Sequence, residues 1–261
     1  MLGAIAGDII GSVHEFGCGK TKGFPLFVAD SRYTDDSVHT VAVADWLLTG
    51  KDLTDSLIER TRAHPGRGYG SMFFQWAHSG QREPYGSYGN GSAMRVSPVG
   101  FAFDDLDEVL ARAELSAAVT HNHPEGVRGA QATAVAIYWA RRTQGREVIR
   151  NEIERSFGYD LHRTLDEIRP HYQFSETCWG TVPQALIAFL ESTNFEDAIR
   201  NAISLGGDAD TLACIAGGVA EAYYGGVPPE IDRQVRERLD PALLEVVDRF
   251  GDKFGRPSSH R

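Results

Sequence analysis

The chain has 261 residues, of which 42% are hydrophobic and 24% charged, so it can bury a sizeable core, and we expect one domain over residues 1–261. Its 26 basic and 36 acidic residues leave a formal charge of −10, and the basic residues form no run. This charge excludes a nucleic-acid backbone or an anionic membrane as the main partner. A phosphate-bearing ligand would have to be held by local devices such as backbone N–H groups, helix N-termini or bound cations.

Cysteine usage and the first residues predict a cytoplasmic protein. The three cysteines, Cys18, Cys178 and Cys214, are far apart and none lies at zinc-ligand spacing, so we expect neither a disulfide framework nor a zinc site. The opening segment has no basic start and Asp8 interrupts its apolar stretch, so we expect no secretory signal. No segment reaches the roughly 18 to 20 apolar residues that span a bilayer.

Apolar residues at helical spacing recur along the whole chain. They predict helices over residues 35–48, 106–119, 125–142, 182–191, 195–204, 209–223 and 240–250. Alternating strand-like runs are nearly absent, so we predict an all-α fold built as a compact helical bundle. Residues 63–94 and 156–181 break the pattern and are rich in Gly, aromatic and His residues. We interpret them as long irregular loops, where binding chemistry tends to lie.

The first acidic residues of the chain lie in an apolar setting. Asp8 has isoleucines on both sides, and a carboxylate there would be strongly disfavoured by desolvation unless it is hydrogen-bonded or paired. Glu15 lies beyond this apolar helical segment and is freer to reach a site.

Two acidic helix starts follow, some 170 residues apart. Each supplies two carboxylates and a Thr hydroxyl just ahead of an apolar helix: Thr34, Asp35 and Asp36 in the first, Asp208, Asp210 and Thr211 in the second. Each alone is better explained as a helix cap, with its carboxylates at the positive end of the helix dipole. Together they offer hard oxygen ligands that suit Mg²⁺ or Mn²⁺ and not zinc or copper.

The spacing within the second start sets a condition on its geometry. Asp208 and Asp210 converge only if Gly206 and Gly207 let the backbone enter the helix irregularly. If the two starts face each other, four carboxylates would repel unless cations lie between them. We therefore predict two Mg²⁺ or Mn²⁺ ions, roughly 3.5 to 4 Å apart, and a less stable protein without them.

Two polar segments lie between these helix starts. Residues 88–95 combine a Gly-Asn-Gly turn with a helix expected to begin near Ser92, which would form an anion-binding nest; an ordinary Asn-Gly turn explains the pattern equally well. Arg95 could pair with a structural carboxylate or with a ligand. His121 and His123 separate two predicted helices, where they could bind metal, act on protons or hold a phosphate, or could serve the helix ends alone.

Taken together, these segments resemble the ADP-ribosylglycohydrolase family. That family includes the enzyme that reactivates dinitrogenase reductase and the vertebrate ADP-ribosyl-arginine and ADP-ribosyl-serine hydrolases. The match runs in order over nearly the whole chain as GDIIGSVHE, YTDDS, GNGSAMR, THNHPEG and SLGGDADTLACIAGGVAEAYYG. One such motif is weak, and five in order are very specific. The resemblance implies an all-α orthogonal helical domain with a dinuclear magnesium or manganese centre at the bottom of a cleft for ADP-ribose.

Carried over by position, the resemblance implies a role for each segment. The implied metal ligands are Thr34, Asp35, Asp36, Asp208, Asp210 and Thr211. The implied catalytic carboxylates are Glu15, Asp35 and Asp36. The implied substrate-binding residues are Glu15, Gly89, Asn90, Gly91, Ser92, Met94, His121 and His123, with Asn122 beside His123 as a second choice. Ser37 stands where relatives commonly have Thr.

The implied reaction is hydrolysis at C1″ of the distal ribose of an ADP-ribosyl group, through an oxocarbenium-like transition state. Asp36 or Glu15 would take a proton from the attacking water. The expected partner is an ADP-ribosylated protein or an ADP-ribose-containing small molecule, and the expected state is a monomer. Two alternatives stay open: an ADP-ribose-binding protein without turnover, and a metal-dependent hydrolase of a nucleotide diphosphate. The residues do not indicate which linkage is cleaved, or whether the ions are Mg²⁺ or Mn²⁺.

Overall fold

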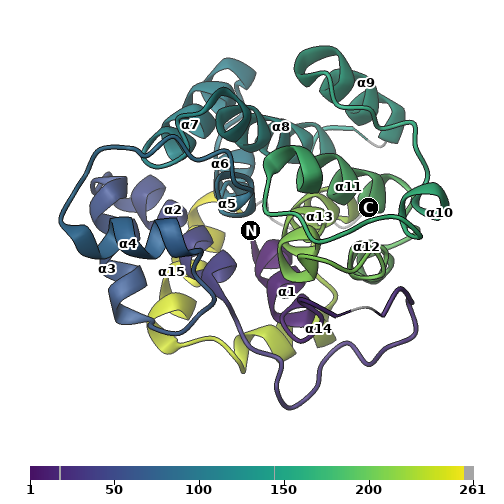
Figure 1. Cartoon of the computed structure of the whole chain (residues 1–261), viewed down its shortest axis with the longest axis horizontal. Coiled ribbons are helices and arrows are strands. Elements are labelled where there is room, and N and C mark those ends of the chain that lie inside the picture. The colour runs from purple at the N-terminus through teal and green to yellow at the C-terminus, as the bar shows by residue number, and fades with distance from the viewer. Residues whose placement is uncertain (18, 144, 256–261) are drawn as a thin grey trace.

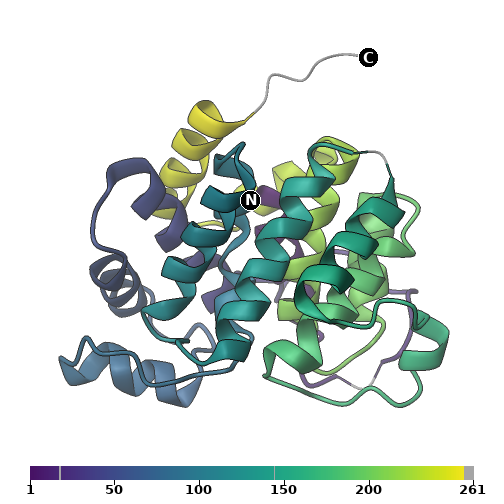
Figure 2. The ribbon, with the colours of Figure 1, turned by 90° about the horizontal axis from the view of Figure 1, so that it is seen from above.

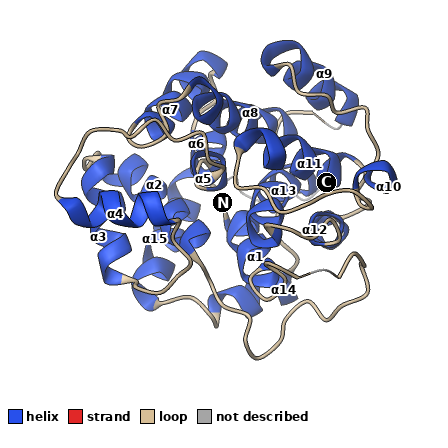
Figure 3. Ribbon diagram, in the orientation of Figure 1, coloured by secondary structure: helices blue, strands red, loops and turns tan. Residues whose placement is uncertain are grey.

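The computed structural model describes residues 1–17, 19–143 and 145–255, and its regular structure is helical (Figure 1, Figure 3). No strand forms in these residues; an isolated antiparallel bridge joins Gly89 and Thr177. The predicted all-α fold is confirmed. The helices are α1 Leu2–Gly11, α2 Asp35–Thr49, α3 Leu53–Ala63, α4 Ser71–Ser79, α5 Gly91–Met94, α6 Ser97–Ala102, α7 Leu106–Ala118, α8 Pro124–Ala140, α9 Arg146–Phe157, α10 Leu165–Ile168, α11 Cys178–Leu190, α12 Phe195–Ile203, α13 Ala209–Tyr224, α14 Pro229–Arg236 and α15 Pro241–Phe254.

Each predicted helix has a counterpart, but the structure adds others. Helices α3, α9 and α14 were not predicted because their apolar stripes are narrow: α9 fully buries only Ile149 and Ile153, and α14 only Ile231 and Val235. The two segments predicted to be irregular are also partly helical, since 63–94 contains α4 and α5 and 156–181 contains α10 and the start of α11.

Helix α11 begins earlier than the sequence predicts. A start at residue 182 puts Pro183 at a first helical position, where proline is usual. The structure instead begins the helix at Cys178, capped by the Thr177 side chain, and keeps Pro183 inside it. The early start brings the N-terminus of α11 to the loop that holds Gly89, because the Cys178 backbone N–H donates to the carbonyl of Tyr88.

Helices α1 and α13, from opposite ends of the sequence, lie against each other at the centre of the fold (Figure 1). Their contact is backbone to backbone, since a Cβ on Gly3 would lie 2.4 Å from the carbonyl oxygen of Gly217 and a Cβ on Gly7 would lie 2.0 Å from that of Ala213. Gly11 continues the same face, with its Cβ position 2.4 Å from the Cα of Asp210. The glycine stripe therefore places the N-terminal half of the site against the C-terminal half.

The remaining helices surround this pair. Helix α8 packs on α7, α11 and α13, and Figure 2 shows the teal helices lying between the blue helices on one side and the green helices on the other. Small residues permit the close approach of α8 and α11, because a Cβ on Gly129 would lie 2.4 Å from the Cys178 sulfur.

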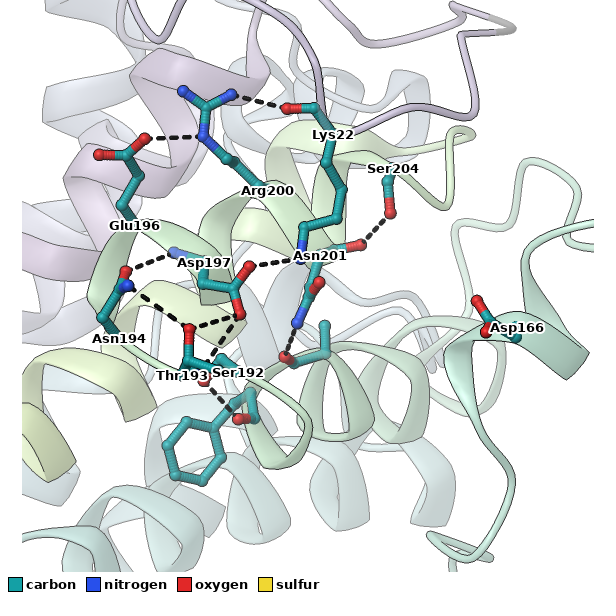
Figure 4. A network of polar contacts seen from close by, with 12 residues as sticks. Lys22, Asp166, Ser192, Thr193, Asn194, Glu196, Asp197, Arg200, Asn201 and Ser204 are labelled. Carbon is teal, nitrogen blue, oxygen red and sulfur yellow. Dashed lines mark hydrogen bonds and ion pairs between the residues drawn. The ribbon is translucent and has the colours of Figure 1, made fainter.

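A long connection, residues 12–34, leads from α1 to α2 and is fastened to α12 (Figure 4). The Arg200 guanidinium donates to the carbonyls of Lys22 and Phe24, each at 2.7 Å, and the Lys22 ammonium pairs with Asp197. The Lys20 ammonium donates to the backbone carbonyls of Arg169 and Tyr172, which follow α10, and of Leu205, which follows α12. The segment that carries Glu15 is thus anchored at its far side.

Two further sequence predictions concern chemistry and membranes. Cys178 and Cys214 are buried free thiols, whereas Cys18 lies outside the described residues. Within the described part of the chain, no helix has the length and apolar character needed to cross a bilayer.

Candidate active site

A cavity of about 230 Å³ opens where the N-terminal ends of α2, α5 and α13 meet. Most of the site residues named from the sequence line it: Glu15, Asp35, Asp36, Gly89, Asn90, Gly91, Met94, His121, Asp208, Asp210 and Thr211. Three others, Thr34, Ser92 and His123, are not among the lining residues. The structure therefore brings together segments from four distant parts of the chain.

The first helix start is held in place by Asp8. Its carboxylate accepts the Thr34 hydroxyl at 2.7 Å and the backbone N–H groups of Thr34 and Ser37 at 3.0 and 3.1 Å. The Ser37 hydroxyl bonds to the same carboxylate. Asp8 thus has the hydrogen bonds that its apolar setting requires. The Thr34 hydroxyl also caps α2 by accepting from the Asp36 N–H, so it is engaged away from the cavity.

The second helix start has the irregular entry that the sequence requires. Gly206 and Gly207 adopt φ angles of 72° and 73°, in the left-handed region open mainly to glycine. Asp208 occupies the N-cap position without capping α13. Its carboxylate instead converges with those of Asp210 and Glu15, so that oxygen atoms of the three lie within 4.8 Å of one another. A capping role therefore does not explain these aspartates.

The two helix starts face each other. The Thr211 hydroxyl donates to the Asp36 carboxylate at 3.3 Å, which joins the start of α13 to that of α2. The Asn90 amide donates to Asp208 at 2.7 Å and to the Thr181 hydroxyl at 3.1 Å, so it orients a carboxylate of the cluster. Asn90, expected as a substrate residue, is thus also a support for the acidic end.

Burial and mutual repulsion disfavour the charged form of these carboxylates. Desolvation, with Asp8 next, raises the pKa of Asp35 and Asp36 well above the usual range. Desolvation and then Asp208 raise the pKa of Asp210 well above it too. The half-buried Glu15 has its pKa raised to about 7 by desolvation and by Asp208. Five clustered carboxylates of this kind need compensating positive charge.

Ion pairs in the described part of the chain do not supply this compensating charge to the four aspartates. Among the described residues, no ion pair includes Asp35, Asp36, Asp208 or Asp210, and the Oδ2 atom of Asp36 is buried without a hydrogen-bond partner. An all-oxygen donor set of this density fits a hard divalent cation such as Mg²⁺ or Mn²⁺.

The glycine loop and His121 also line the cavity. His121 lies beside the glycine loop, with its Nε2 atom 3.1 Å from the position of a Cβ on Gly91 and 3.5 Å from that on Gly89. Two hydrogen bonds hold the loop in place. The Ser92 hydroxyl donates to the Gly126 carbonyl at 2.7 Å, and the Asn90 backbone N–H donates to the Glu176 carbonyl at 2.7 Å. The Ser92 side chain therefore serves the loop's position.

The two histidines have different positions. His123 is exposed and caps α8, its Nδ1 atom accepting the Glu125 N–H at 3.1 Å, and its ring meets that of Tyr88 edge-on at 5.5 Å. The Asn122 side chain accepts from the Gly86 N–H at 2.8 Å and so also shapes the loop. Only His121 of these three lines the cavity.

Several lining residues were not named individually from the sequence. They lie mainly in the two Gly- and aromatic-rich segments that the sequence marked as binding loops: Gly68, Gly70, Ser71, Met72, Phe73, Tyr85, Ser87, Phe174 and Glu176. His39 and Arg95 complete the inner wall. Composition thus located the two segments that carry these residues. Which of their residues line the cavity depends on α4 and on the turn that leads into α11.

An exposed aromatic pair lies at the edge of the acidic end. The rings of Phe16 and Phe174 stack with centroids 5.0 Å apart. Phe16 has a φ of 62°, unusual for a residue with a side chain, and its N–H donates to the Gly207 carbonyl at 3.2 Å. This contact holds the neighbouring Glu15 over the Gly206–Gly207 turn.

Comparisons with known proteins agree with one another. A family model described as ADP-ribosylglycohydrolase matches residues 1–259. ADP-ribosylhydrolase ARH3 of Gallus gallus is 30% identical over 76% of this chain and 72% of its own length. ADP-ribosylarginine hydrolase Tri1 of Pseudomonas putida is 27% identical over 95% of this chain and 77% of its own. A solved structure titled ADP-ribosylglycohydrolase-related protein complex superposes with a TM-score of 0.67 over 97% of this chain and 96% of that one, at 24% identity, and so shares the fold.

Proposed function

The chain belongs to the ADP-ribosylglycohydrolase family, and from this premise we propose that it hydrolyses the bond at C1″ of the distal ribose in an ADP-ribosylated protein or small molecule, releasing ADP-ribose. The observation that carries the proposal is the cavity itself, because it gathers carboxylates from both helix starts and is also lined by the glycine loop and His121. ADP-ribose offers the hydroxyls of its distal ribose to the first group and an anionic diphosphate to the second.

Two divalent cations, Mg²⁺ or Mn²⁺, are part of the proposal. Asp35, Asp36, Asp208, Asp210 and Thr211 line the cavity and would hold them; the Thr34 hydroxyl is committed to Asp8 and to the helix cap. When bound, the ions would neutralise these carboxylates, orient the ribose hydroxyls and lower the pKa of a nearby water.

Glu15 is our choice for the group that takes a proton from the attacking water. It is half-buried and lies at the cavity edge on a connection outside the helices, with a carboxylate oxygen close to those of Asp208 and Asp210. Asp36 is the second choice, because its Oδ2 atom is free but buried. The remaining negative charge of the cluster would stabilise the developing positive charge at C1″.

The glycine loop and His121 would hold the diphosphate. Gly89, Gly91 and His121 line the cavity, and the buried Arg95 guanidinium, which also lines it, would favour an anion there. The carboxylates at the two helix starts would repel a diphosphate. The ligand would therefore bind in one orientation, with its diphosphate at the glycine loop.

The test is release of free ADP-ribose from arginine-, serine- and O-acetyl-linked substrates, each with Mg²⁺, with Mn²⁺ and with a chelator. We expect metal-dependent release from at least one substrate, and the substrate that reacts identifies the linkage. AMP as the product would instead indicate cleavage of the diphosphate. Tight ADP-ribose binding without release from any substrate would indicate a binding protein.

A further inference from the structure

Arg95 is a fully buried guanidinium without a carboxylate partner among the described residues. Its Nη2 atom donates to the Ser116 carbonyl at 2.7 Å and to the Thr120 hydroxyl at 2.9 Å, while Nε and Nη1 have no acceptor. Burial lowers the pKa of Arg95 to about 10. A buried, incompletely bonded charge is strongly disfavoured, so its presence at the cavity wall calls for a role.

The Thr120 hydroxyl links this charge to His121. A hydroxyl has one proton and two acceptor lone pairs, and a guanidinium can only donate, so Thr120 accepts from Arg95 and keeps its own proton to give. The Thr120 oxygen lies 2.7 Å from the Nδ1 atom of His121, and no other acceptor for this hydroxyl occurs in the described residues. Donation from the hydroxyl to Nδ1 satisfies both groups.

The proton of a neutral His121 ring then lies on Nε2, the nitrogen beside Gly89 and Gly91. We propose that Arg95 is a positioning residue which, acting through Thr120, fixes His121 as a neutral hydrogen-bond donor whose Nε2–H faces the cavity and binds an oxygen of a diphosphate-containing ligand. The identity of this ligand rests on the proposed function, whereas the tautomer does not.

The surroundings of His121 keep the ring neutral. Burial, followed by the charges of Arg95 and His39, lowers the pKa of His121 well below its usual value. The Tyr85 ring lies 6.2 Å away, centroid to centroid. A neutral ring with a fixed proton offers one donor of constant direction, which a ring free to exchange tautomers does not.

The tautomer is measured directly by ¹⁵N NMR of the ring nitrogens in the wild-type protein with labelled histidine. The chain has nine histidines, so the His121 signals are assigned by their loss in His121→Asn. We expect a protonated Nε2 and an unprotonated, hydrogen-bonded Nδ1 near neutral pH. A proton on Nδ1, a mixture of both tautomers or a doubly protonated ring would overturn the proposal.

Variants test the two supporting residues. Arg95→Met leaves the Thr120 hydroxyl free to accept from Nδ1–H, so we expect the Nδ1–H form to appear. Thr120→Val removes the hydroxyl at nearly constant shape, so we expect the hydrogen-bonded Nδ1 signal to be lost and the tautomer no longer to be fixed. Thr120→Ser is the matched control and keeps the wild-type spectrum. A residue with only a structural role would lower the melting temperature without changing the tautomer. If either variant fails to fold, the wild-type spectrum still shows which ring nitrogen of His121 carries the proton, and so still tests the proposal.

The ligand is tested by calorimetric titration with ADP-ribose. We expect Thr120→Val to bind about tenfold more weakly than the wild type, the usual effect of one misdirected hydrogen bond, and Thr120→Ser to bind within about twofold. A folded Thr120→Val protein with wild-type affinity would contradict the role in binding. Failure of the wild type itself to bind ADP-ribose would contradict the proposed function and leave the tautomer result standing.

Discussion

Asp210 illustrates at the scale of one residue how this chain holds groups that weaken its fold. Its carboxylate is buried beside Asp208 and within reach of Asp36 and Glu15, with no cation from the described protein to offset them. Such a group is retained for its chemistry, since its charge destabilises the metal-free protein.

We expect Asp210→Asn to lose metal binding and activity together. Even residues that only support metal ligands change affinity by about 10- to 100-fold, so we expect at least about a hundredfold loss here. In a chelator, the variant should melt at the same temperature as the wild type or higher, because one repelling carboxylate is gone. Asp252→Asn, an exposed position in α15, is the control. A fully active variant that is saturated with metal would rule out Asp210 as a ligand.

Glu15 gives the metal-free protein a characteristic pH dependence. Its pKa is raised from 4.5 to about 7, and the pKa values of the four neighbouring cavity aspartates are raised in the same direction. The folded state therefore binds more protons than the unfolded state above pH 4.5, and this stabilisation disappears as the pH rises through about 7.

Thermal unfolding in a chelator tests this dependence. The melting temperature should fall between about pH 5 and pH 8, and the fall should be smaller in Glu15→Gln and smaller again with saturating Mg²⁺ or Mn²⁺. A metal-free melting temperature that rises over this range would be inconsistent with buried, uncompensated carboxylates.

At the scale of elements, the contact between α1 and α13 depends on the absence of side chains. A Cβ on Gly7 would lie 2.0 Å from the Ala213 carbonyl oxygen, which belongs to the backbone and cannot move aside. We expect Gly7→Ala to destabilise the protein by about 3 kcal/mol or more, the upper range for overpacking. Chemical denaturation measures the effect.

The matched control is Gly251→Ala in α15. This glycine is exposed and nothing lies within 4 Å of its Cβ position, so the same substitution should stabilise the protein by about 0.5 to 1 kcal/mol. Equal effects of the two substitutions would mean that helix propensity, and not the backbone contact, decides the outcome at Gly7.

The helices that the sequence predicted are those whose apolar faces are wide. Helix α13 buries all of its first twelve residues and was found from its pattern, whereas α14 buries only Ile231 and Val235 and was not. Helix α4 was missed for another reason: Phe73 and Trp76 pack inward but lie within a Gly- and His-rich segment that reads as a loop. The start of α11 was misplaced because its first residues were assigned to the irregular segment 156–181, whereas the Thr177 cap begins the helix at Cys178.

The site was predictable where its chemistry is local. The glycines before Asp208 and the acids at both helix starts are visible in sequence, and the structure brings them to one cavity. What sequence could not show is which hydroxyls the fold engages elsewhere, because Thr34 and Ser37 both turn to Asp8 across the α1–α2 contact. The Arg95–Thr120–His121 chain likewise depends on packing.

At the scale of the whole molecule, bound metal should stabilise the entire fold. An ion that binds only the folded state adds about 2.7 kcal/mol at a hundredfold excess over its Kd. For a chain of this size we expect a rise in melting temperature of roughly 5 to 10 °C. Scans at increasing Mg²⁺ and Mn²⁺ measure it, with Asp35→Asn as the control that should not respond. A wild-type melting temperature unaffected by either ion would contradict the proposed metal centre.

The glycine-lined face of α1 also bears on how the molecule forms during synthesis. Leu2–Gly11 is made about two hundred residues before its partner, Ala209–Tyr224. Until then α1 has no backbone to pack against, and Asp36 has no opposing helix start. Such distant pairings slow folding. A nascent chain therefore completes its cavity only after α13 has been made, and fragments that end before α13 should have neither affinity for metal nor activity.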